Sequence, residues 1–515
     1  MRKIFYLRPK AARKVSHQND FTIVIHSSRG FGAKNDRPWF FKVAQSYRYD
    51  VVVIGSGPNG LSAAITMARH GKSVVVYEAQ AKIGGGARSA ELTLPGFTHD
   101  VCSSVYPLAV GSPFFRTLPL AQHGLEWIQP PAALAHPFDD GTAVTLERSV
   151  DTTAAELGAD EPSYRRLMAP LVTAWDGLDT DLLGPLRLPR HPWKLSRFGW
   201  LAIQPGRRLA EKRFQEKRAR GLFAGLVGHS MLPLEYWGSA AFGLVLAISG
   251  HSLGWPLARG GAQRLTDALA GYLLSLGGEI ISNKRVRNLD ELPPSRVVLC
   301  DVTPRQLREI AAENLSQSYR TKLSRYRYGM GAFKMDWALS GPVPWKAHEC
   351  TRAATLHLGG TLEEIAFSEQ SAWRGEPVEK PFVLLAQPSL FDPSRAPEGG
   401  HTLWGYCHVP NGSAFNMAER IEKQIERFAP GFSNLVIRRS VMPPSELENR
   451  NANLVGGDIN GGAPTLGQLF FRPTVKMYGT SRKGLYLCSA STPPGGGVHG
   501  MCGYFAARHA LKEMF

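Results

Sequence analysis

The sequence predicts an α/β fold built around a Rossmann-like nucleotide-binding unit, and two observations support this prediction. Residues 51–54 form a short β-branched run, which is typical of a buried parallel strand. Gly55, Gly57 and Gly60 follow with the spacing of a G-x-G-x-x-G turn before a helix. The first glycine allows a sharp turn, the second lets a pyrophosphate approach the backbone, and the third lets the helix pack closely on the strand.

The elements after this turn complete the unit. We expect a helix over residues 61–69 and a second strand over residues 73–77, and Glu78 ends that strand 18 residues after the last glycine. A carboxylate at this place binds the ribose hydroxyls of an adenine dinucleotide, and it disfavours the extra phosphate of NADP. The context therefore favours a dinucleotide site over the alternative, an ordinary strand–helix–strand unit with an empty turn.

The bulk properties limit the class of protein. The chain has 515 residues, enough for several domains, and its composition is that of a folded globular protein. The net charge of +17 is concentrated in residues 1–49 and residues 186–220, which carry +9 each. This distribution argues against a general nucleic-acid-binding field. The six cysteines are scattered without a C-x-x-C pair, which argues against a zinc site, a disulfide framework or a dithiol redox centre. We expect no metal.

The N-terminal residues and the apolar runs bear on location. Residues 1–48 are basic and precede the first strand, and we interpret them as a dispensable or wrongly assigned extension, with a transit peptide as the alternative. The longest apolar run, residues 237–249, is shorter than the roughly 18–20 residues of a membrane span, and we expect a buried helix there. We therefore expect a cytoplasmic protein, or a mitochondrial matrix protein if residues 1–48 are a transit peptide.

A second glycine-rich turn favours FAD over NAD. Residues 84–86 are all glycine, and Arg88 follows them directly. Backbone N–H groups and a guanidinium both neutralise phosphate charge. NAD-dependent Rossmann dehydrogenases do not usually need such a segment, whereas flavoproteins that bind an extended FAD often have it. We therefore expect Gly85 and Arg88 beside the pyrophosphate.

The middle of the chain contains a basic and aromatic segment. Trp193, Phe198 and Trp200 interleave with lysine and arginine inside residues 186–220. A solvated basic face over a core helix is the favoured interpretation. A peripheral membrane contact through which a lipophilic substrate enters is the alternative, since basic and tryptophan side chains suit the headgroup region. Nucleic-acid binding is the least favoured.

Further α/β elements follow, and the C-terminal ones suggest the reactive end of the cofactor. Residues 495–497 are glycines before a helix that we expect to run from residue 498 to the end. Glycines there leave room for a planar ring, and the helix dipole can stabilise negative charge on a reduced flavin. The other expected elements are a helix over residues 262–276 and strands over residues 279–286, 296–301, 333–339, 381–387 and 484–488.

Several of these segments resemble the phytoene desaturase-like branch of FAD-dependent oxidoreductases, including the pyridine nucleotide-disulfide oxidoreductase domain-containing protein 2 group. The resemblance covers roughly residues 49–515 and includes Ile-Gly-Ser-Gly-Pro-Asn-Gly at the first turn and Pro-Gly-Gly-Gly-Val before the last helix. The matching segments are residues 51–60, 83–89, 94–100, 254–261, 278–286, 331–345, 456–473 and 485–500.

The resemblance implies a Rossmann-like FAD-binding domain assembled from discontinuous segments, with an inserted α+β substrate domain. The FAD-binding domain would comprise residues 49–106, 256–330 and 441–515, and the substrate domain residues 107–255 and 331–440. The resemblance further implies that Glu78 contacts the ribose, Arg88 the pyrophosphate and the Val286 backbone the adenine. It places residues 495–498, which include Gly496, Gly497 and Val498, beside the isoalloxazine. Ser489 departs from the pattern, because relatives commonly have glycine there.

The function expected is that of an FAD-dependent dehydrogenase or desaturase. It would move hydride from a C–H bond of an apolar, polyene or lipid-like substrate to flavin N5, with a quinone or oxygen as a candidate electron acceptor. The alternatives are a flavin-dependent isomerase, an amine oxidase, and a non-catalytic FAD-binding regulatory protein. His499 is the favoured catalytic residue because it adjoins the flavin-side glycines. The other polar candidates, for which a structural role is the more common one, are His99, Asp100, His229 and His251.

Overall fold

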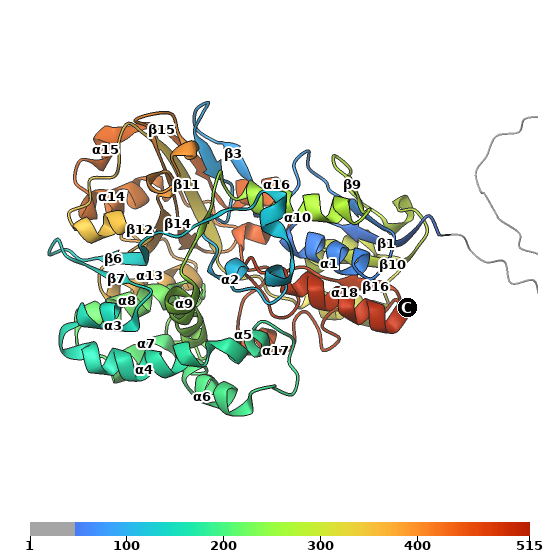
Figure 1. The fold of residues 1–515 in the computed structure, drawn as a ribbon, viewed down its shortest axis with the longest axis horizontal. Helices are drawn as coiled ribbons and strands as arrows, with labels where there is room; N and C mark the ends of the chain where they lie inside the picture. The colour runs from blue at the N-terminus through green and yellow to red at the C-terminus, as the bar shows by residue number, and fades with distance from the viewer. Residues whose placement is uncertain (1–46) are drawn as a thin grey trace, which may run out of the picture.

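A computed structural model describes residues 47–515, and two β-sheets organise this part of the chain (Figure 1). The predicted N-terminal extension, with its transit-peptide alternative, lies outside the described residues except for its last two positions. The first sheet gathers strands from the beginning, the middle and the end of the chain, and the second sheet gathers strands from two middle segments.

The first sheet is a five-stranded, fully parallel sheet with β1 at its centre. Both faces of the sheet are covered, as the continuous β-branched run in β1 predicts, and Val51, Val52 and Val53 are all fully buried. In order across the sheet the strands are β16 (Leu485–Leu487), β10 (Ser295–Cys300), β1 (Tyr49–Ile54), β2 (Val74–Tyr77) and β9 (Glu279–Ile281).

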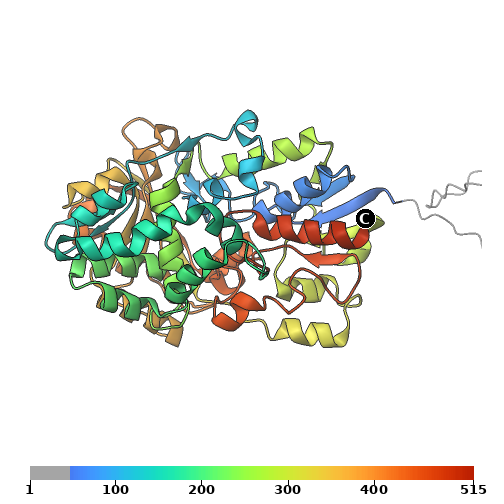
Figure 2. The same cartoon turned by 60° about the horizontal axis from the view of Figure 1, so that its bottom comes forward.

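Helices from distant parts of the chain cover this sheet. Helices α1 (Pro58–Ala68), α10 (Gln263–Ser275) and α18 (Met501–Met514) share one apolar core with it. Helices α11 (Pro304–Ile310) and α12 (Gln317–Ser324) share the core on the other face. Figures 1 and 2 both place α18, the last helix, beside the first elements of the chain. The predicted Rossmann-like layers are therefore present.

One strand is shorter than the sequence predicts. The expected strand over residues 279–286 ends at Ile281, because the following polar residues turn toward the loop after β2. There the backbone N–H of Lys284 donates to the Glu78 carbonyl at 2.8 Å, and the N–H of Asn283 donates to the Gln80 carbonyl at 3.0 Å. This turn brings Val286 to the edge of the first sheet.

The second sheet has seven strands and is antiparallel except for the pairing of β6 with β12. The predicted boundary between residues 440 and 441 falls inside β15, which belongs to this sheet. In order across the sheet the strands are β15 (Val436–Met442), β11 (Gly331–Leu339), β14 (His401–Val409), β13 (Val383–Ala386), β12 (Ala353–Leu358), β6 (Ala132–Pro137) and β7 (Ala143–Leu146).

Helix α14 (Ala418–Phe428) packs on one face of the second sheet, and a group of helices covers the other face. Helix α9 in that group is largely buried, in agreement with the buried helix expected over residues 237–249. Among residues 47–515, no helix combines the length and apolar character needed to cross a membrane. The group consists of α3 (Val150–Ala155), α4 (Glu161–Thr173), α5 (Trp175–Leu182), α6 (Pro192–Ala202), α7 (Gly206–Arg213), α8 (Lys217–Gly228), α9 (Ser239–Leu253) and α13 (Leu362–Arg374).

Short elements connect the two sheets. Two ribbons, β3 with β4 and β5 with β8, lie in these connections, and α16 follows β15 directly. The connecting elements are β3 (Ser89–Glu91), β4 (Thr98–Asp100), α2 (Pro107–Val110), β5 (Trp127–Ile128), β8 (Leu257–Ala258), α16 (Pro444–Arg450) and α17 (Leu466–Phe470), whereas α15 (Phe432–Leu435) joins α14 to β15 within the second sheet's part of the fold.

Candidate cofactor and substrate site

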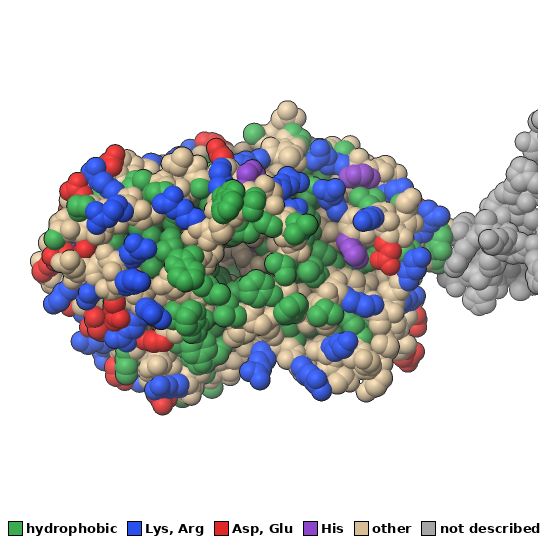
Figure 3. Space-filling model, turned by 90° about the horizontal axis from the view of Figure 1, so that it is seen from below, with side chains coloured by type: hydrophobic (Ala, Val, Ile, Leu, Met, Phe, Trp, Pro, Cys, Tyr) green, Lys and Arg blue, Asp and Glu red, His purple; other side chains and the backbone are tan. Residues whose placement is uncertain are grey.

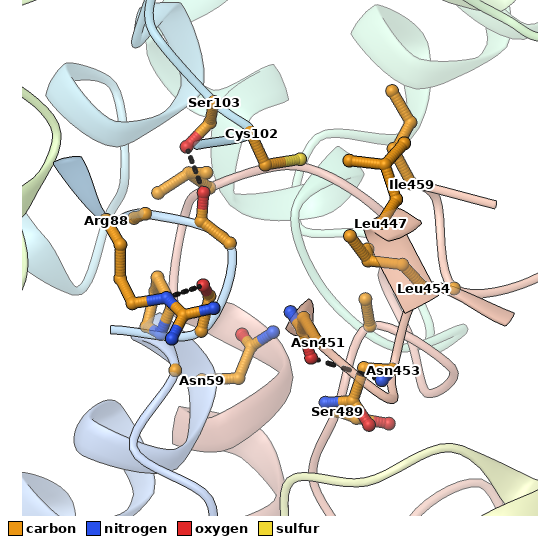
Figure 4. A pocket seen from close by; sticks show the side chains of 18 of the residues that line it. Asn59, Arg88, Cys102, Ser103, Leu447, Asn451, Asn453, Leu454, Ile459 and Ser489 are labelled. Atoms are coloured by element: carbon orange, nitrogen blue, oxygen red, sulfur yellow. Dashed lines mark hydrogen bonds between the residues drawn. The ribbon is translucent and has the colours of Figure 1, made fainter. Parts of the chain in front are cut away.

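One large cavity of about 760 Å³ reaches from the first sheet to the second. Its lining includes the carboxyl ends of β1, β2 and β10, where parallel α/β sheets bind their ligands. It also includes side chains of β11, β12, β13 and β14 from the second sheet. Figure 4 shows part of this lining, in which residues from distant segments converge on one space.

The first glycine turn forms one end of the cavity. Gly55 has a left-handed backbone with φ of +97°, which favours glycine. A Cβ atom on Gly57 would lie 2.7 Å from Asp301 Oδ2, and one on Gly60 would lie 2.0 Å from the Gly55 carbonyl oxygen. Gly55 and Gly57 line the cavity, whereas Gly60 allows α1 to pack against the turn.

This turn presents backbone donors to the cavity. Helix α1 begins at Pro58, and its N-cap residue Gly57 has no side chain. In its first turn the Gly60 N–H is bound by the Asp301 carboxyl, whereas the Asn59 N–H has no acceptor among the described residues and stays free for a ligand. Uncapped N–H groups and the positive end of the helix dipole together form a natural site for a phosphate. The turn therefore fits the pyrophosphate of a dinucleotide.

Glu78 lies at the end of β2 and lines the cavity. Its carboxylate accepts hydrogen bonds from the Ser56 N–H at 3.0 Å, from the Ser56 hydroxyl at 2.6 Å and from the Gln80 N–H at 2.9 Å. These bonds hold the carboxylate beside the glycine turn, at the position expected for a contact with the ribose.

Asp301 is a second carboxyl at this turn, and no role was predicted for it. It follows β10, lines the cavity and accepts a hydrogen bond from the Gly60 N–H at 2.9 Å. Burial raises its pKa from 3.8 to about 7, the Gly60 hydrogen bond opposes this shift, and the nearby Glu78 adds to it. The neutral form of Asp301 is therefore favoured in the fold below about pH 7.

The raised pKa of Asp301 predicts that the free energy of unfolding depends on pH. The substitution Asp301→Asn should remove this part of the dependence. The pKa is raised in the folded state, so the unfolded chain ionises first and wild-type stability falls as pH rises from about 4 to about 7. Because Asn stays neutral and keeps an acceptor oxygen, we expect the variant to gain about 4 kcal/mol relative to wild type across this range. Urea unfolding at matched FAD concentration measures the difference, and parallel pH profiles for the two proteins would contradict it.

The second glycine turn lies against the first. A Cβ atom on Gly85 would lie 3.1 Å from the Gly57 Cα. The Arg88 Nε donates to the Gly85 carbonyl at 2.8 Å (Figure 4). A terminal nitrogen of Arg88 donates to the Arg450 carbonyl at 2.9 Å. Both Gly85 and Arg88 line the cavity. The predicted pair thus provides a backbone turn and a buried guanidinium beside the first turn.

The remaining predicted cofactor residues are spread along the same cavity. Val286, Gly497 and Val498 line it. Gly496 lies behind the lining, where a Cβ atom would come within 2.8 Å of Asn460 Oδ1. Ser489 also lines the cavity, and its hydroxyl accepts a hydrogen bond from the Ser491 N–H at 3.3 Å, which holds the side chain against its own loop.

Asparagines form a set of polar groups that sequence reasoning missed. Asn59 Oδ1 and Asn460 Nδ2 are buried, and neither atom has a hydrogen-bond partner among the described residues. Buried amides of this kind call for a bound partner. Figure 4 shows Asn59, Asn451 and Asn453 around the same space. The donor set of this region, amides with one guanidinium and two glycine turns, fits a dinucleotide such as FAD.

The far end of the cavity is a largely apolar chamber. Its polar members are few: His229 follows α8, and the others named below lie on the second sheet, where Lys334 on β11 forms a buried ion pair with Asp336. Burial lowers the pKa of Lys334 and raises that of Asp336 to about 6. The apolar lining consists of Leu108, Met231, Leu246, Trp255, Leu384, Leu447, Leu454 and Ile459.

The sequence offers five polar residues as candidates for chemistry. Within residues 47–515, His229 lines the cavity, whereas His99, Asp100, His251 and His499 do not. His229 shares a 2.8 Å Nε2–Nε2 hydrogen bond with His357, and burial lowers its pKa to about 3. His99 contacts Thr93 at 2.7 Å, and Asp100 pairs with Arg395 at 2.9 Å. His251 contacts the Tyr164 hydroxyl at 2.8 Å.

His499, the residue predicted to be catalytic, lies outside the lining of the cavity formed by residues 47–515. Its ring Nδ1 accepts a hydrogen bond from the Met501 N–H at 3.0 Å, at the start of α18, and burial lowers its pKa to about 4. The Ser112 hydroxyl donates to its carbonyl at 2.6 Å. His499 therefore holds the start of the last helix, and its proximity to the glycines in sequence does not bring its ring into the cavity.

Comparisons with known proteins agree with this architecture. Residues 53–118 match the model of the NAD(P)-binding Rossmann-like domain. Pyridine nucleotide-disulfide oxidoreductase domain-containing protein 2 of Mus musculus is 28% identical over 90% of this chain and 94% of that protein. Phytoene desaturase (neurosporene-forming) of Rhodobacter capsulatus is 25% identical over 88% of this chain and 91% of its own.

A solved structure shows the same fold. The crystal structure of an oxidoreductase from Methanosarcina mazei superposes with a TM-score of 0.64 and 14% identity, covering 90% of this chain and 99% of that one. The predicted α/β, Rossmann-like fold is confirmed, and so is the resemblance to phytoene desaturase-like proteins.

Proposed function

We propose that the protein is an FAD-dependent oxidoreductase that removes hydride from a C–H bond of an apolar substrate. The observation that carries this proposal is the single cavity, which joins two glycine turns and Glu78 at one end to an apolar chamber at the other. The similarity to a phytoene desaturase over 88% of this chain supports both the reaction class and an apolar substrate.

The residues that would hold FAD are spread over the length of the cavity. The turns at Gly57 and Gly85, with Arg88, would hold the pyrophosphate, and Glu78 would bind the ribose. Val498, at the C-terminal glycine segment, would lie at the ring end. Bound FAD would supply the hydride acceptor.

The protein's own contribution is to position the substrate and exclude water. The apolar chamber walls remove a hydrocarbon chain from solvent, at roughly 25 cal/mol per Å² of buried apolar surface. They also hold a reacting carbon in a fixed place, which lowers the entropic part of the barrier. His229 is neutral at physiological pH and is hydrogen-bonded to His357, so it acts as a wall of the chamber rather than as an acid.

Anaerobic reduction of the bound flavin tests the proposed reaction. Holoprotein is mixed with cyclic and linear polyenes, with saturated lipids and with amines, and the visible absorbance of the flavin is followed. Reduction by an apolar C–H donor supports the proposal. Reduction by amines alone would make the protein an amine oxidase, and conversion of a polyene without net flavin reduction would make it an isomerase.

We further propose that the surface around α6 docks on a membrane containing anionic lipids. Trp193 and Trp200 on α6 are 87% and 76% exposed, and Leu188 just before the helix is 93% exposed. Phe198 on the same helix is buried, as the core-helix interpretation expects. Figure 3 views the side on which α6 lies in Figure 1 and shows hydrophobic side chains around a hollow, with lysines and arginines about them.

Basic residues complete this surface. Residues 186–220 carry a net charge of +9. The two exposed tryptophans line a groove together with Arg166, Arg197 and Arg213. Tryptophan and arginine together suit the headgroup region, where the ring is partly buried and the cation pairs with a phosphate.

The double variant Trp193→Ala/Trp200→Ala tests this surface. We expect it to reduce partitioning onto vesicles of phosphatidylcholine and phosphatidylserine by at least about tenfold, because two aromatic anchors are removed. Leu274→Ala, at a 54% exposed position on α10, is the matched control and should bind as wild type does. Co-sedimentation measures the partitioning, and equal binding by all three proteins would refute the proposal.

A further inference from the structure

The chamber wall formed by the second sheet carries polar groups in a defined order. In one row across the sheet, Thr355 pairs with Ala386, Ala386 pairs with Trp404, and Trp404 pairs with Asp336. Paired residues point to the same face of a sheet. Thr355, Ala386 and Trp404 all line the cavity. The small Ala386 side chain leaves a hollow between the two larger neighbours.

Both larger neighbours have an unsatisfied polar group. Thr355 Oγ1 and Trp404 Nε1 are buried and have no hydrogen-bond partner anywhere in the described chain. Thr355 as a whole is only 6% exposed. Because an indole N–H can only donate and buried donors are nearly always paired, Trp404 calls for an acceptor atom from a ligand.

The charges at this wall decide which acceptor fits. The Lys334 ammonium lies 5.8 Å from the centroid of a Trp404 ring, and its charge is already paired with Asp336. A carboxylate placed here would be desolvated without an unpaired counter-charge, which is unfavourable. A neutral oxygen meets the donors without that penalty.

We propose that the chamber binds an apolar molecule bearing a neutral carbonyl oxygen. This oxygen accepts a hydrogen bond from Trp404 Nε1, and the Thr355 hydroxyl is the second donor of the same wall. This inference deepens the proposed function, on which it rests for the identity of the chamber as the substrate site. It narrows the substrate from a pure hydrocarbon to an apolar ketone, aldehyde or ester. The rest of the molecule would lie against Met231, Leu246 and Leu384.

Two ligands of the same shape test this inference. In 2-methyl-1-tridecene a methylene replaces the carbonyl oxygen of 2-tridecanone, so the two ligands match in shape, and a tighter-bound ketone means that the hydrogen bond outweighs the loss of the ketone's hydration. Equilibrium dialysis with FAD-saturated protein should show the ketone bound at least about tenfold more tightly than the alkene. The preference should disappear in Trp404→Phe/Thr355→Val, which removes both donors, keeps an aromatic ring at position 404 and keeps the side-chain shape at position 355.

Trp255→Phe is the matched control. Trp255 also lines the cavity, but its indole N–H already donates to the Leu246 carbonyl and to the Ser249 hydroxyl, both at 3.3 Å. This variant should keep the ketone preference. Equal binding of the two ligands to wild type, failure of both to bind, or an unchanged preference in the double variant would overturn the inference. The ratio of the ketone and alkene affinities is also measured by dialysis without FAD, where the same preference is expected. A protein that shows this preference but binds no flavin would refute the proposed function and leave the inference about the chamber intact.

Discussion

Gly57→Ala is expected to leave the protein folded and to weaken FAD binding by at least about 100-fold, or about 2.7 kcal/mol. The backbone of Gly57 has φ of −64° and ψ of 171°, which alanine adopts without strain. The added methyl group would lie 2.7 Å from Asp301 Oδ2, so the Asp301 carboxyl, which holds the Gly60 N–H, would have to move at the turn that would bind the pyrophosphate. The loss is therefore one of binding.

Titration of flavin-free protein with FAD measures this loss, and thermal melting without FAD checks that the variant folds. Gly199→Ala on α6 is the matched control, because in the described structure no atom lies within 4 Å of the Cβ it adds. It should bind FAD as wild type does. If Gly57→Ala binds FAD with unchanged affinity, the first glycine turn is not the pyrophosphate site.

Gly503→Ala is expected to destabilise the fold by about 3 kcal/mol or more, although helix propensity predicts the opposite. Alanine is favoured over glycine in a helix by about 1 kcal/mol. Gly503 lies in the first turn of α18, however, and its Cβ would lie 1.8 Å from the Asn59 carbonyl oxygen and 2.7 Å from the Asn59 carbonyl carbon. The backbones of α1 and α18 would have to separate, which disrupts packing in the core.

Urea unfolding measures this change in the free energy of unfolding. Gly199→Ala again provides the comparison, since it makes the same replacement in a helix without a close neighbour and should be as stable as wild type or slightly more stable. FAD content should also fall in Gly503→Ala, because Asn59 lines the cavity. A Gly503→Ala protein as stable as the Gly199→Ala protein would show that the two helices do not approach as described.

The dinucleotide end could be predicted from the sequence because its signals are local. Gly55, Gly57, Gly60 and Glu78 lie within one strand–turn–helix–strand unit, so their spacing alone places them together. Asp301 joins the same turn from 241 residues away, and only the pairing of β1 with β10 brings it there. The sequence marks it as an acid at the end of a strand but does not indicate its partner.

The chamber could not be predicted in this way. Thr355 and Trp404 become neighbours across Ala386 through the register of three strands, and register depends on tertiary packing. His499 shows why closeness in sequence to the glycine segment does not determine where a side chain points. Its ring instead accepts a hydrogen bond from the backbone of its own helix.

Release of the bound cofactor tests the central proposal most directly. The protein is purified without added flavin, its visible spectrum is recorded, and the cofactor is released by denaturation and identified by mass spectrometry. We expect a flavin spectrum and FAD close to one molecule per chain, or full recovery of that spectrum after incubation with FAD. Protein that carries no flavin and regains none on incubation with FAD would contradict the proposed function.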